Sequence, residues 1–303
     1  VKENLPDSKY FCSHTTQTCH APQGQGVAPC PCGRIWSKKE DAAMKLNILR
    51  ADPAGNITIF VLDPVERAQR AHIAARIMAL PGLGCEQVGF LCQPREGGDG
   101  RMEMMGGEFC GNATRAFGLL LAQKLGGPAQ VRVETSGCDH VVTVDTDLAA
   151  GTARSEMPLP LWLRPARAAG HSGTLVHLGG IAHLVVEDVE PSLDFFQAAE
   201  PLFRELEGLD AYGVIFLDTA QGKMTPLVKV PATDTLVWEG SCGSGSLAAA
   251  LSQSAGLEEG EFARDYLQPA GVVRATVVRR NGSVTAAYIG GPVTLGQPME
   301  VEL

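Results

Sequence analysis

The sequence predicts an α+β protein of two similar halves, each with short strands around one apolar helix. Two matching stretches, residues 109–118 and 240–250, each set a cysteine beside a glycine just before an apolar run with helical character. Most of the remaining chain after residue 43 consists of short segments typical of strands. With 303 residues and 45% hydrophobic content, the chain can bury one large core or two modest ones.

The first half is expected to combine short strands with one outer and one buried helix. The run over 112–124 is apolar nearly all round and ends before a Gly-Gly-Pro stop, so we expect it to be buried inside a curved sheet. The other expected elements are a strand at 57–62, an amphipathic helix at 64–80, and a strand pair at 131–135 and 141–144.

The second half is also expected to combine short strands with one outer and one buried helix. A second buried helix is expected over 244–255, where Gly256 stops it. The other expected elements are strands at 176–178 and 183–186, and an outer helix at 191–199 that Pro201 interrupts or restarts.

Proline and glycine breakers place the crossing between the halves at residues 158–173. The final strand, after Gly291-Pro292, is expected to return to the first half. The predicted domains are therefore 44–157 with 290–303, and 158–289. Residues 1–43 show neither strand alternation nor helical period, and we interpret them as a disordered extension.

The two cysteines, Cys110 and Cys242, are each predicted to stand at a helix N-terminus. Such an end carries unpaired N–H groups and a partial positive charge, which hold an anion and favour a thiolate. Two helix N-termini that face one pocket would bind the carboxylate of a substrate, while the two sulfurs lie on opposite sides of the same carbon atom. One thiolate could remove a proton and the other thiol return one, as racemisation without a cofactor requires.

The sequence resembles the diaminopimelate epimerase family of PLP-independent, two-cysteine racemases, which includes histidine racemases. The resemblance covers about residues 44–303. The motifs that carry it are Cys110-Gly111-Asn112, Cys242-Gly243-Ser244-Gly245, Gly55-Asn56, the Gly82 to Gln87 turn, His183 and Gly291-Pro292.

The resemblance implies a fold in which two pseudo-symmetric halves each form a strongly curved sheet or barrel around a central helix. It implies no cofactor and no metal. Cys110 and Cys242 would be the catalytic thiols, and His183 would partner Cys110. Substrate-binding positions would be Asn56, Gln87, Gly111, Asn112, Gly243 and Ser244.

Departures from the family pattern argue against diaminopimelate as the substrate. The family's Glu-Arg pair before the second cysteine, which anchors the distal carboxylate, falls here on Thr233 and Asp234. We therefore expect an amino acid with a neutral or cationic side chain, such as histidine. Asp234 or Glu86 is a candidate counter-charge, and the alternative interpretation of Asp234 is a solvated turn residue.

The acid–base partner of Cys242 stays open. The family's glutamate position is occupied here by Trp238, and Glu239 lies three residues before the cysteine. The sequence leaves Glu239, Asp234 and no partner as alternatives, and Glu239 joins Asp234 among the candidate site residues.

Three other functions are compatible with parts of the sequence. A diaminopimelate epimerase is disfavoured by the missing anchor. A thiol hydrolase using one cysteine with His183 would leave the second cysteine motif without a role. An amino-acid-binding homologue that has lost catalysis is disfavoured because both cysteines are retained.

The amino-acid composition argues against some classes of binding partner. A formal net charge of -9 and an isoelectric point near 5.3 argue against nucleic acid and anionic membranes, because no basic stripe is available. No run of about 18 apolar residues appears, and the sequence predicts a cytoplasmic protein with a homodimer as a possible assembly.

An odd number of cysteines, nine, favours a reducing compartment. The cysteines and histidines of residues 1–43 fit no ordinary zinc spacing, so no metal is assigned.

Overall fold

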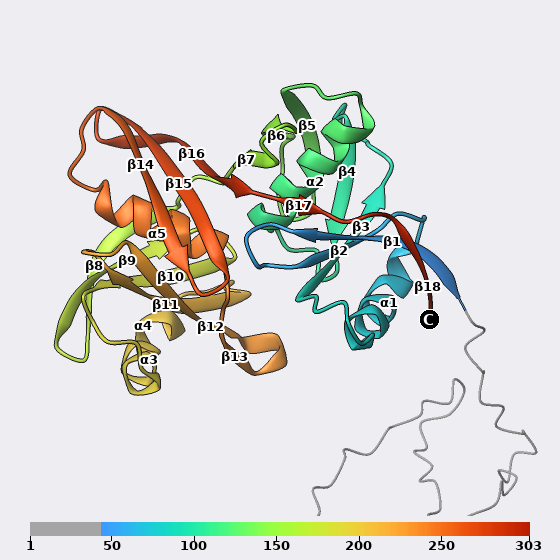
Figure 1. Cartoon of the computed structure of the whole chain (residues 1–303). Helices are drawn as coiled ribbons and strands as arrows, with labels where there is room; N and C mark the ends of the chain where they lie inside the picture. Colours follow the sequence, from blue (N-terminus) through green and yellow to red (C-terminus); the bar gives the residue numbers. More distant parts are fainter. Residues whose placement is uncertain (1–43) are drawn as a thin grey trace, which may run out of the picture. The chain divides into compact units, whose positions relative to one another are not determined.

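The computed structural model describes residues 44–303. The predictions of a disordered extension and of no zinc site at residues 1–43 lie outside this range. The described chain is a sheet-rich α+β fold in which hydrogen bonds join eighteen strands into one network (Figure 1). No helix within residues 44–303 is both long enough and apolar enough to span a membrane.

The helices and strands of this region are short. The helices are α1 (Arg67–Ala79), α2 (Gly111–Lys124), α3 (Leu193–Ala199), α4 (Pro201–Arg204) and α5 (Gly243–Gln253), with a 3₁₀ turn at Pro231–Thr233. The strands are β1 (Lys45–Asp52), β2 (Thr58–Val61), β3 (Gln87–Cys92), β4 (Gly100–Met104), β5 (Gln130–Thr135), β6 (Val142–Asp147), β7 (Thr152–Glu156), β8 (Trp162–Ala168), β9 (His171–His177), β10 (Ile181–Glu187), β11 (Ala211–Asp218), β12 (Lys223–Val230), β13 (Thr235–Trp238), β14 (Gly260–Gln268), β15 (Gly271–Arg280), β16 (Ser283–Pro292), β17 (Thr294–Leu295) and β18 (Met299–Glu302).

Helix α2 is buried among the first strands of the chain. It packs against β4, β5, β6 and β7 (Figure 1). All of its residues from Gly111 to Ala122 are buried. A helix that is apolar on every side is stable in water only when it is surrounded in this way. Helix α1 instead buries one stripe, Ile73, Ala74 and Ile77, against a separate cluster that includes strand β3.

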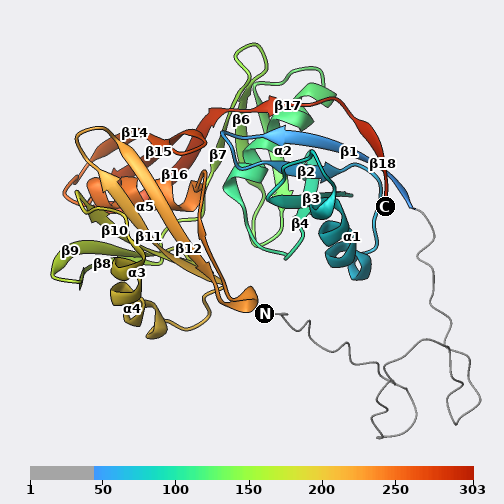
Figure 2. The same cartoon turned by 60° about the horizontal axis from the view of Figure 1, so that its bottom comes forward.

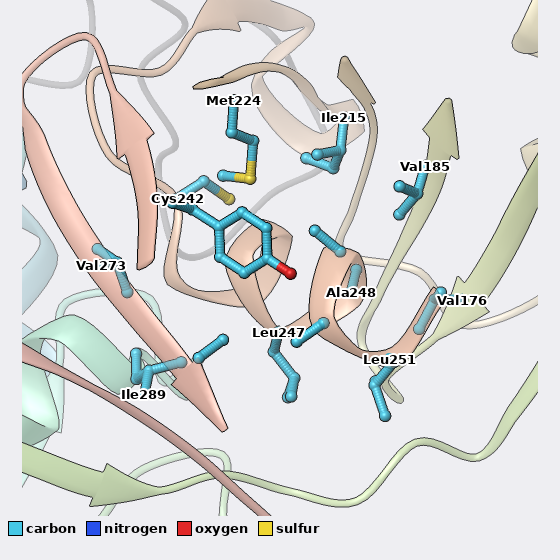
Figure 3. Packing of buried hydrophobic residues seen from close by; sticks show 14 of the residues in the cluster. Val176, Val185, Ile215, Met224, Cys242, Leu247, Ala248, Leu251, Val273 and Ile289 are labelled. Atoms are coloured by element: carbon cyan, nitrogen blue, oxygen red, sulfur yellow. The ribbon is translucent and has the colours of Figure 1, made fainter. Parts of the chain in front are cut away.

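Helix α5 is buried among later strands. It packs against β9, β10, β14, β15 and β16, and Leu247, Ala248 and Leu251 are enclosed in its cluster (Figure 3). Helices α3 and α4 contribute to another cluster, which contains Phe195, Phe203 and Phe216. Leu184 of β10 lies in that cluster while its neighbour Val185 lies in the α5 cluster, as strand alternation requires.

Strand β16 connects the strands around α5 with those around α2. Its residues pair with β15 as far as Gly290 and with β7 from Tyr288 to Pro292. The chain then continues into β17 and β18, which both pair antiparallel with β1 (Figure 2). The end of the chain is thereby hydrogen-bonded to the strand that begins the described region.

Most predicted elements are present within a few residues of the expected bounds, including both buried helices. The segment 158–173, where the crossing between the halves is expected, contains strand β8 and the start of β9, which are joined as a hairpin. Pro165 suggested a breaker, yet it pairs with Thr174 inside β8. Within residues 44–303, β8 pairs with β9 alone, and an edge strand tolerates proline because its outer N–H groups need no partner.

Candidate active site

Cys110 and Cys242 cap the two buried helices in the same way. Their backbone angles are nearly equal, with φ −130° and ψ 108° at Cys110 and φ −118° and ψ 108° at Cys242. The Sγ of Cys110 accepts the Ala113 N–H at 3.5 Å, and the Sγ of Cys242 accepts the Gly245 N–H at 3.3 Å. Each sulfur therefore points toward the free N–H groups of its own helix, where negative charge is stabilised.

The N-termini of α2 and α5 lie against each other. A Cβ placed on Gly243 would lie 3.5 Å from Cγ and Oδ1 of Asn112. Ile289 fills the adjoining space, because its Cδ1 would be 2.8 Å from a Cβ on Gly111 and 2.7 Å from one on Gly243. Glycine after each cysteine is therefore required by close packing.

A polar cluster surrounds Cys110. The Gln87 side chain donates to Asn56 Oδ1 at 2.8 Å and is also hydrogen-bonded with the thiol. Asn56 Oδ1 is 3.9 Å from the Cys110 sulfur, and its Nδ2 donates to Glu86 Oε2 at 2.6 Å. Burial raises the pKa of the Cys110 thiol, while the Ala113 N–H and Gln87 lower it and Glu108 raises it further. The predicted substrate residues Asn56 and Gln87 are thus neighbours of Cys110.

Cys242 lies inside the α5 cluster, near Met224 and Ile215 (Figure 3). Its backbone N–H donates to the buried Gln268 Oε1 at 2.7 Å, and Gln268 Nε2 donates to Ser246 Oγ at 3.0 Å. Ser244 Oγ is 3.5 Å from the sulfur. The backbone of Cys242 is thereby hydrogen-bonded to a buried side chain that is itself bonded to α5.

Glu239 contacts the Cys242 thiol. Its carboxyl group hydrogen-bonds with Cys242, and burial together with the charge of Glu86 raises the pKa of Glu239 to about 7. Burial and then Glu239 raise the pKa of Cys242 well above its usual value. Of the three alternatives left open for the partner of Cys242, the geometry favours Glu239. Glu86 is adjacent too, since its Oε1 would be 3.9 Å from a Cβ on Gly240.

His183 is buried on the Cys242 side of the site. Its Nε2 is 2.9 Å from Ser244 Oγ, and its Nδ1 has no hydrogen-bond partner. Burial lowers the pKa of His183 to about 3, so the ring is neutral at ordinary pH. The expected pairing of His183 with Cys110 is not formed in this structure. The reason is positional: β10 carries His183 beside α5, so Ser244 is the group within reach.

Asp234 does not join this cluster. It follows the Pro231–Thr233 turn with φ 54°, its side chain is 91% exposed, and it pairs with Lys229. The alternative interpretation of a solvated turn residue fits this position. Asp234 is therefore neither the partner of Cys242 nor a buried counter-charge in this conformation.

Sequence reasoning missed several residues that build the site. Arg115 is fully buried and bonded to Asn112, Gln268 holds the Cys242 backbone, and Ile289 packs against both helix ends. Of these three residues, only Arg115 could have been singled out from the sequence, because it is a cation inside an otherwise apolar helix. The other two lie far from either cysteine motif in sequence, and only folding brings them close.

One further group of potential metal ligands lies on the exposed turn after β5. The ligand atoms of Cys138, Asp139 and His140 lie within 4.8 Å of one another. Cys138 and His140 also line a cavity of about 340 Å³ that Arg70 and Arg101 border. This cavity contains neither Cys110 nor Cys242, and we assign no metal to the turn.

Solved structures with this fold define a class. A hydroxyproline epimerase from Agrobacterium vitis is 12% identical, with a TM-score of 0.58 over 86% of this chain and 93% of its own. A protein from Pseudomonas aeruginosa described as a predicted epimerase, also 12% identical, gives a TM-score of 0.59 over 84% of this chain and 99% of its own. With the sequence relatives below, the fold places the chain among the cofactor-independent amino-acid racemases and epimerases, which are isomerases.

Comparison of the amino-acid sequence with known proteins identifies the family of this chain. The family model described as "Histidine racemase CntK N-terminal domain" matches residues 45–297, and the chain belongs to this family. It is 30% identical over 267 residues to a histidine racemase of Fusobacterium nucleatum subsp. nucleatum, covering 82% of this chain and 94% of that protein. A histidine racemase of Staphylococcus aureus is 27% identical over 259 residues, covering 80% and 92%.

Proposed function

We propose that this racemase inverts the Cα of histidine, or of another amino acid with a neutral or cationic side chain, by a two-base thiol mechanism. One observation carries the proposal. Cys110 and Cys242 cap two helices whose N-termini are in contact, so both sulfurs and both sets of free N–H groups serve one small region. The substrate is proposed from the histidine racemases to which the chain is similar.

The residues of the site have complementary roles in this proposal. The N–H groups of Gly111, Asn112, Gly243 and Ser244 bind the substrate carboxylate. Asn56 and Gln87 orient the substrate beside Cys110. One sulfur, as thiolate, removes the Cα proton while the thiol on the opposite face returns one. Glu239 exchanges protons with Cys242, and His183 orients Ser244 beside the same sulfur.

Helix N-termini supply the electrostatic stabilisation that this reaction needs. The Cα proton beside a carboxylate is weakly acidic, and negative charge develops on the carboxylate as the proton leaves. Fixed N–H donors that already point at this charge stabilise the transition state without reorganising. Glu86, beside Asn56, is the remaining candidate to bind a cationic group of the substrate.

We also propose that residues 44–157 with 290–303, and 158–289, form two pseudo-symmetric domains with the site between them. The repetition of a cysteine-capped buried helix supports this division. Both thiols must stay reduced to act as acid and base, which is consistent with a cytoplasmic location. A homodimer stays a prediction.

The test is proton NMR of the reduced full chain in deuterium oxide with each enantiomer of histidine, lysine, arginine and diaminopimelate. The native protein should exchange the Cα proton of both enantiomers of its substrate. Cys110→Ala and Cys242→Ala should abolish racemisation, and each should retain exchange with at most one enantiomer, opposite in the two variants. Cys92→Ala, which removes a cysteine outside the site, should leave exchange unchanged.

Three outcomes would contradict the proposal. Unchanged racemisation in either single variant would exclude the two-thiol mechanism. Exchange with diaminopimelate alone would overturn the proposed substrate class. Absence of exchange with every amino acid would favour the non-catalytic binding alternative, and release of a hydrolysis product would favour the thiol hydrolase.

A further inference from the structure

The tripeptide Pro-Ala-Gly occurs twice in the sequence, at residues 53–55 and 269–271. The first copy lies in the turn between β1 and β2, and the second leads from β14 into β15. Strands β1 and β2 contribute to the hydrophobic cluster around α2, whereas β14 and β15 pack against α5. Each buried helix with its capping cysteine is therefore accompanied by one Pro-Ala-Gly turn.

The alanine of each turn packs on the glycine of the other. A Cβ placed on Gly55 would overlap the Cβ of Ala270 and would lie 2.8 Å from the Ala270 carbonyl oxygen. A Cβ placed on Gly271 would lie 2.9 Å from the Cβ of Ala54 and 2.8 Å from the Ala54 carbonyl oxygen. These distances are shorter than van der Waals contact, so the turns can approach this closely only with both glycines present. We call this reciprocal contact between the two turns the clasp.

Ala54 belongs to both sides of the site. It lies in the hydrophobic cluster around α5, although Leu49 and Ala51 of the preceding strand lie in the cluster around α2. Its φ of 59° is in the left-handed region, where a residue with a Cβ is strained. Glycine would relieve this strain, but it would remove the methyl group that packs against Gly271.

The first turn places Asn56 beside Cys110. The buried Arg115 anchors this turn, because its Nη2 donates a hydrogen bond to Pro53 O at 2.9 Å. Asn56 directly follows the turn, and its Oδ1 is 3.9 Å from the Cys110 sulfur. A displacement of the turn would therefore move Asn56 relative to this sulfur.

The second turn is bonded to the segment that carries Cys242. Gln268, which directly precedes the turn, accepts the Cys242 backbone N–H at 2.7 Å. The Ala270 N–H donates to Gly240 O at 2.9 Å. Gly240 directly follows Glu239, which hydrogen-bonds with the Cys242 thiol. A displacement of this turn would therefore disturb both the cysteine and its carboxyl partner.

We propose that the clasp sets the distance between the Cys110 side and the Cys242 side of the site, with Ala54 and Ala270 as positioning residues. Proton transfer between a sulfur and Cα depends steeply on geometry, and a misplacement of about 1 Å can cost about a hundredfold in rate. This inference rests on the proposed two-thiol mechanism, but the approach of the two sides can also be measured without activity.

The first test removes one methyl group from the clasp. Ala54→Gly should lower kcat for racemisation about three- to tenfold, because the turn before Asn56 loses its contact. KM should change less than about twofold, because the N–H groups proposed to bind the carboxylate belong to α2 and α5. Ala270→Gly should behave alike, and the double variant should lose less than the product of the two effects.

Ala169→Gly is the matched control for Ala54→Gly. Ala169 also has a left-handed backbone, with φ 48°, and also precedes a glycine, Gly170. A Cβ on Gly170 would meet no atom of residues 44–303 within 4 Å, so this turn makes no comparable contact. The control should leave kcat unchanged. Equal kcat values in Ala54→Gly and Ala169→Gly would overturn the positioning role of Ala54.

The second test forces the turns apart. The backbone of Gly271 lies outside the left-handed region, so alanine can adopt it, and the new Cβ would collide with Ala54. Gly271→Ala should therefore lower kcat at least about tenfold. Gly256→Ala is its control, because a Cβ there would meet no atom of the described chain within 4 Å.

A cross-linking measurement reports the clasp without activity. The reduced full-length protein is treated with dibromobimane, whose two bromomethyl groups join two thiols only when these lie close together. Peptide mass spectrometry then gives the fraction of Cys110 joined to Cys242. The native protein and Gly256→Ala should give equal yields, and Gly271→Ala should give a yield at least about threefold lower. Monobromobimane, which reacts with one thiol, should still label both cysteines in Gly271→Ala.

The two proposals fail in different ways. An active racemase in which Gly271→Ala equals Gly256→Ala in kcat and in cross-link yield would overturn the clasp alone, even if Gly271→Ala melts at a lower temperature. Absence of Cα exchange in the native protein would contradict the proposed function, and the cross-link yields of the two variants would still decide whether the clasp sets the distance.

Discussion

Gly243 of α5 faces Asn112 of α2, and a Cβ at Gly243 would lie 3.5 Å from the Asn112 amide. Gly243 directly follows Cys242 and Asn112 lies two residues after Cys110, and each of these cysteines caps its helix. The contact therefore brings two capped helix ends together from positions about 130 residues apart in the chain. The proposed carboxylate site depends on this approach.

Gly243→Ala should lower kcat/KM by at least tenfold, because the new Cβ would be 2.7 Å from Ile289 Cδ1 and would push α5 away from α2. Ile289→Val removes that Cδ1 atom, so the double variant should recover much of the lost activity. Gly256→Ala is the control, since a Cβ there meets nothing within 4 Å. Equal activity in the single and double variants would contradict the contact as the cause.

Glu239 should make stability fall as pH rises. Its pKa of about 7 in the folded protein exceeds the ordinary value of 4.5. The folded state therefore holds a proton that the unfolded chain has released, and this contribution is complete below about pH 4.5 and is lost as pH rises through about 7. Melting temperatures of the native protein and Glu239→Gln should diverge between about pH 5 and 8, with the native protein falling relative to the variant. Parallel curves would exclude a raised pKa.

His183 should produce the opposite trend. Its pKa of about 3 in the folded protein is below the ordinary value of 6.5, so the unfolded chain binds a proton that the folded protein excludes. Its contribution is complete above about pH 6.5 and is lost as pH falls toward about 3. Between about pH 7.5 and 5.5, urea unfolding should show the native protein losing about 1.4 kcal/mol more than His183→Gln. An equal loss in both proteins would show that His183 is protonated when folded.

The local elements of this fold were predictable because their causes are local. Helix α2 and helix α5 follow from an apolar run, a capping cysteine and a stop, all within about fifteen residues of sequence. Strand β8 was missed because Pro165 breaks a central strand but not an edge strand, and its position at the edge depends on which strands pair.

The sequence alone determined the two cysteines, the glycines after them, and the buried helices that they cap, since cap chemistry and apolar periodicity act over a few residues. Only the tertiary structure decided which polar groups meet each sulfur. It placed Gln87 and Asn56 beside Cys110 and Glu239 beside Cys242. It also placed His183 beside Ser244, and it left the Asp234 side chain exposed to solvent. Those contacts depend on strand register and on the packing of β10 and β16, which join residues that no short motif relates.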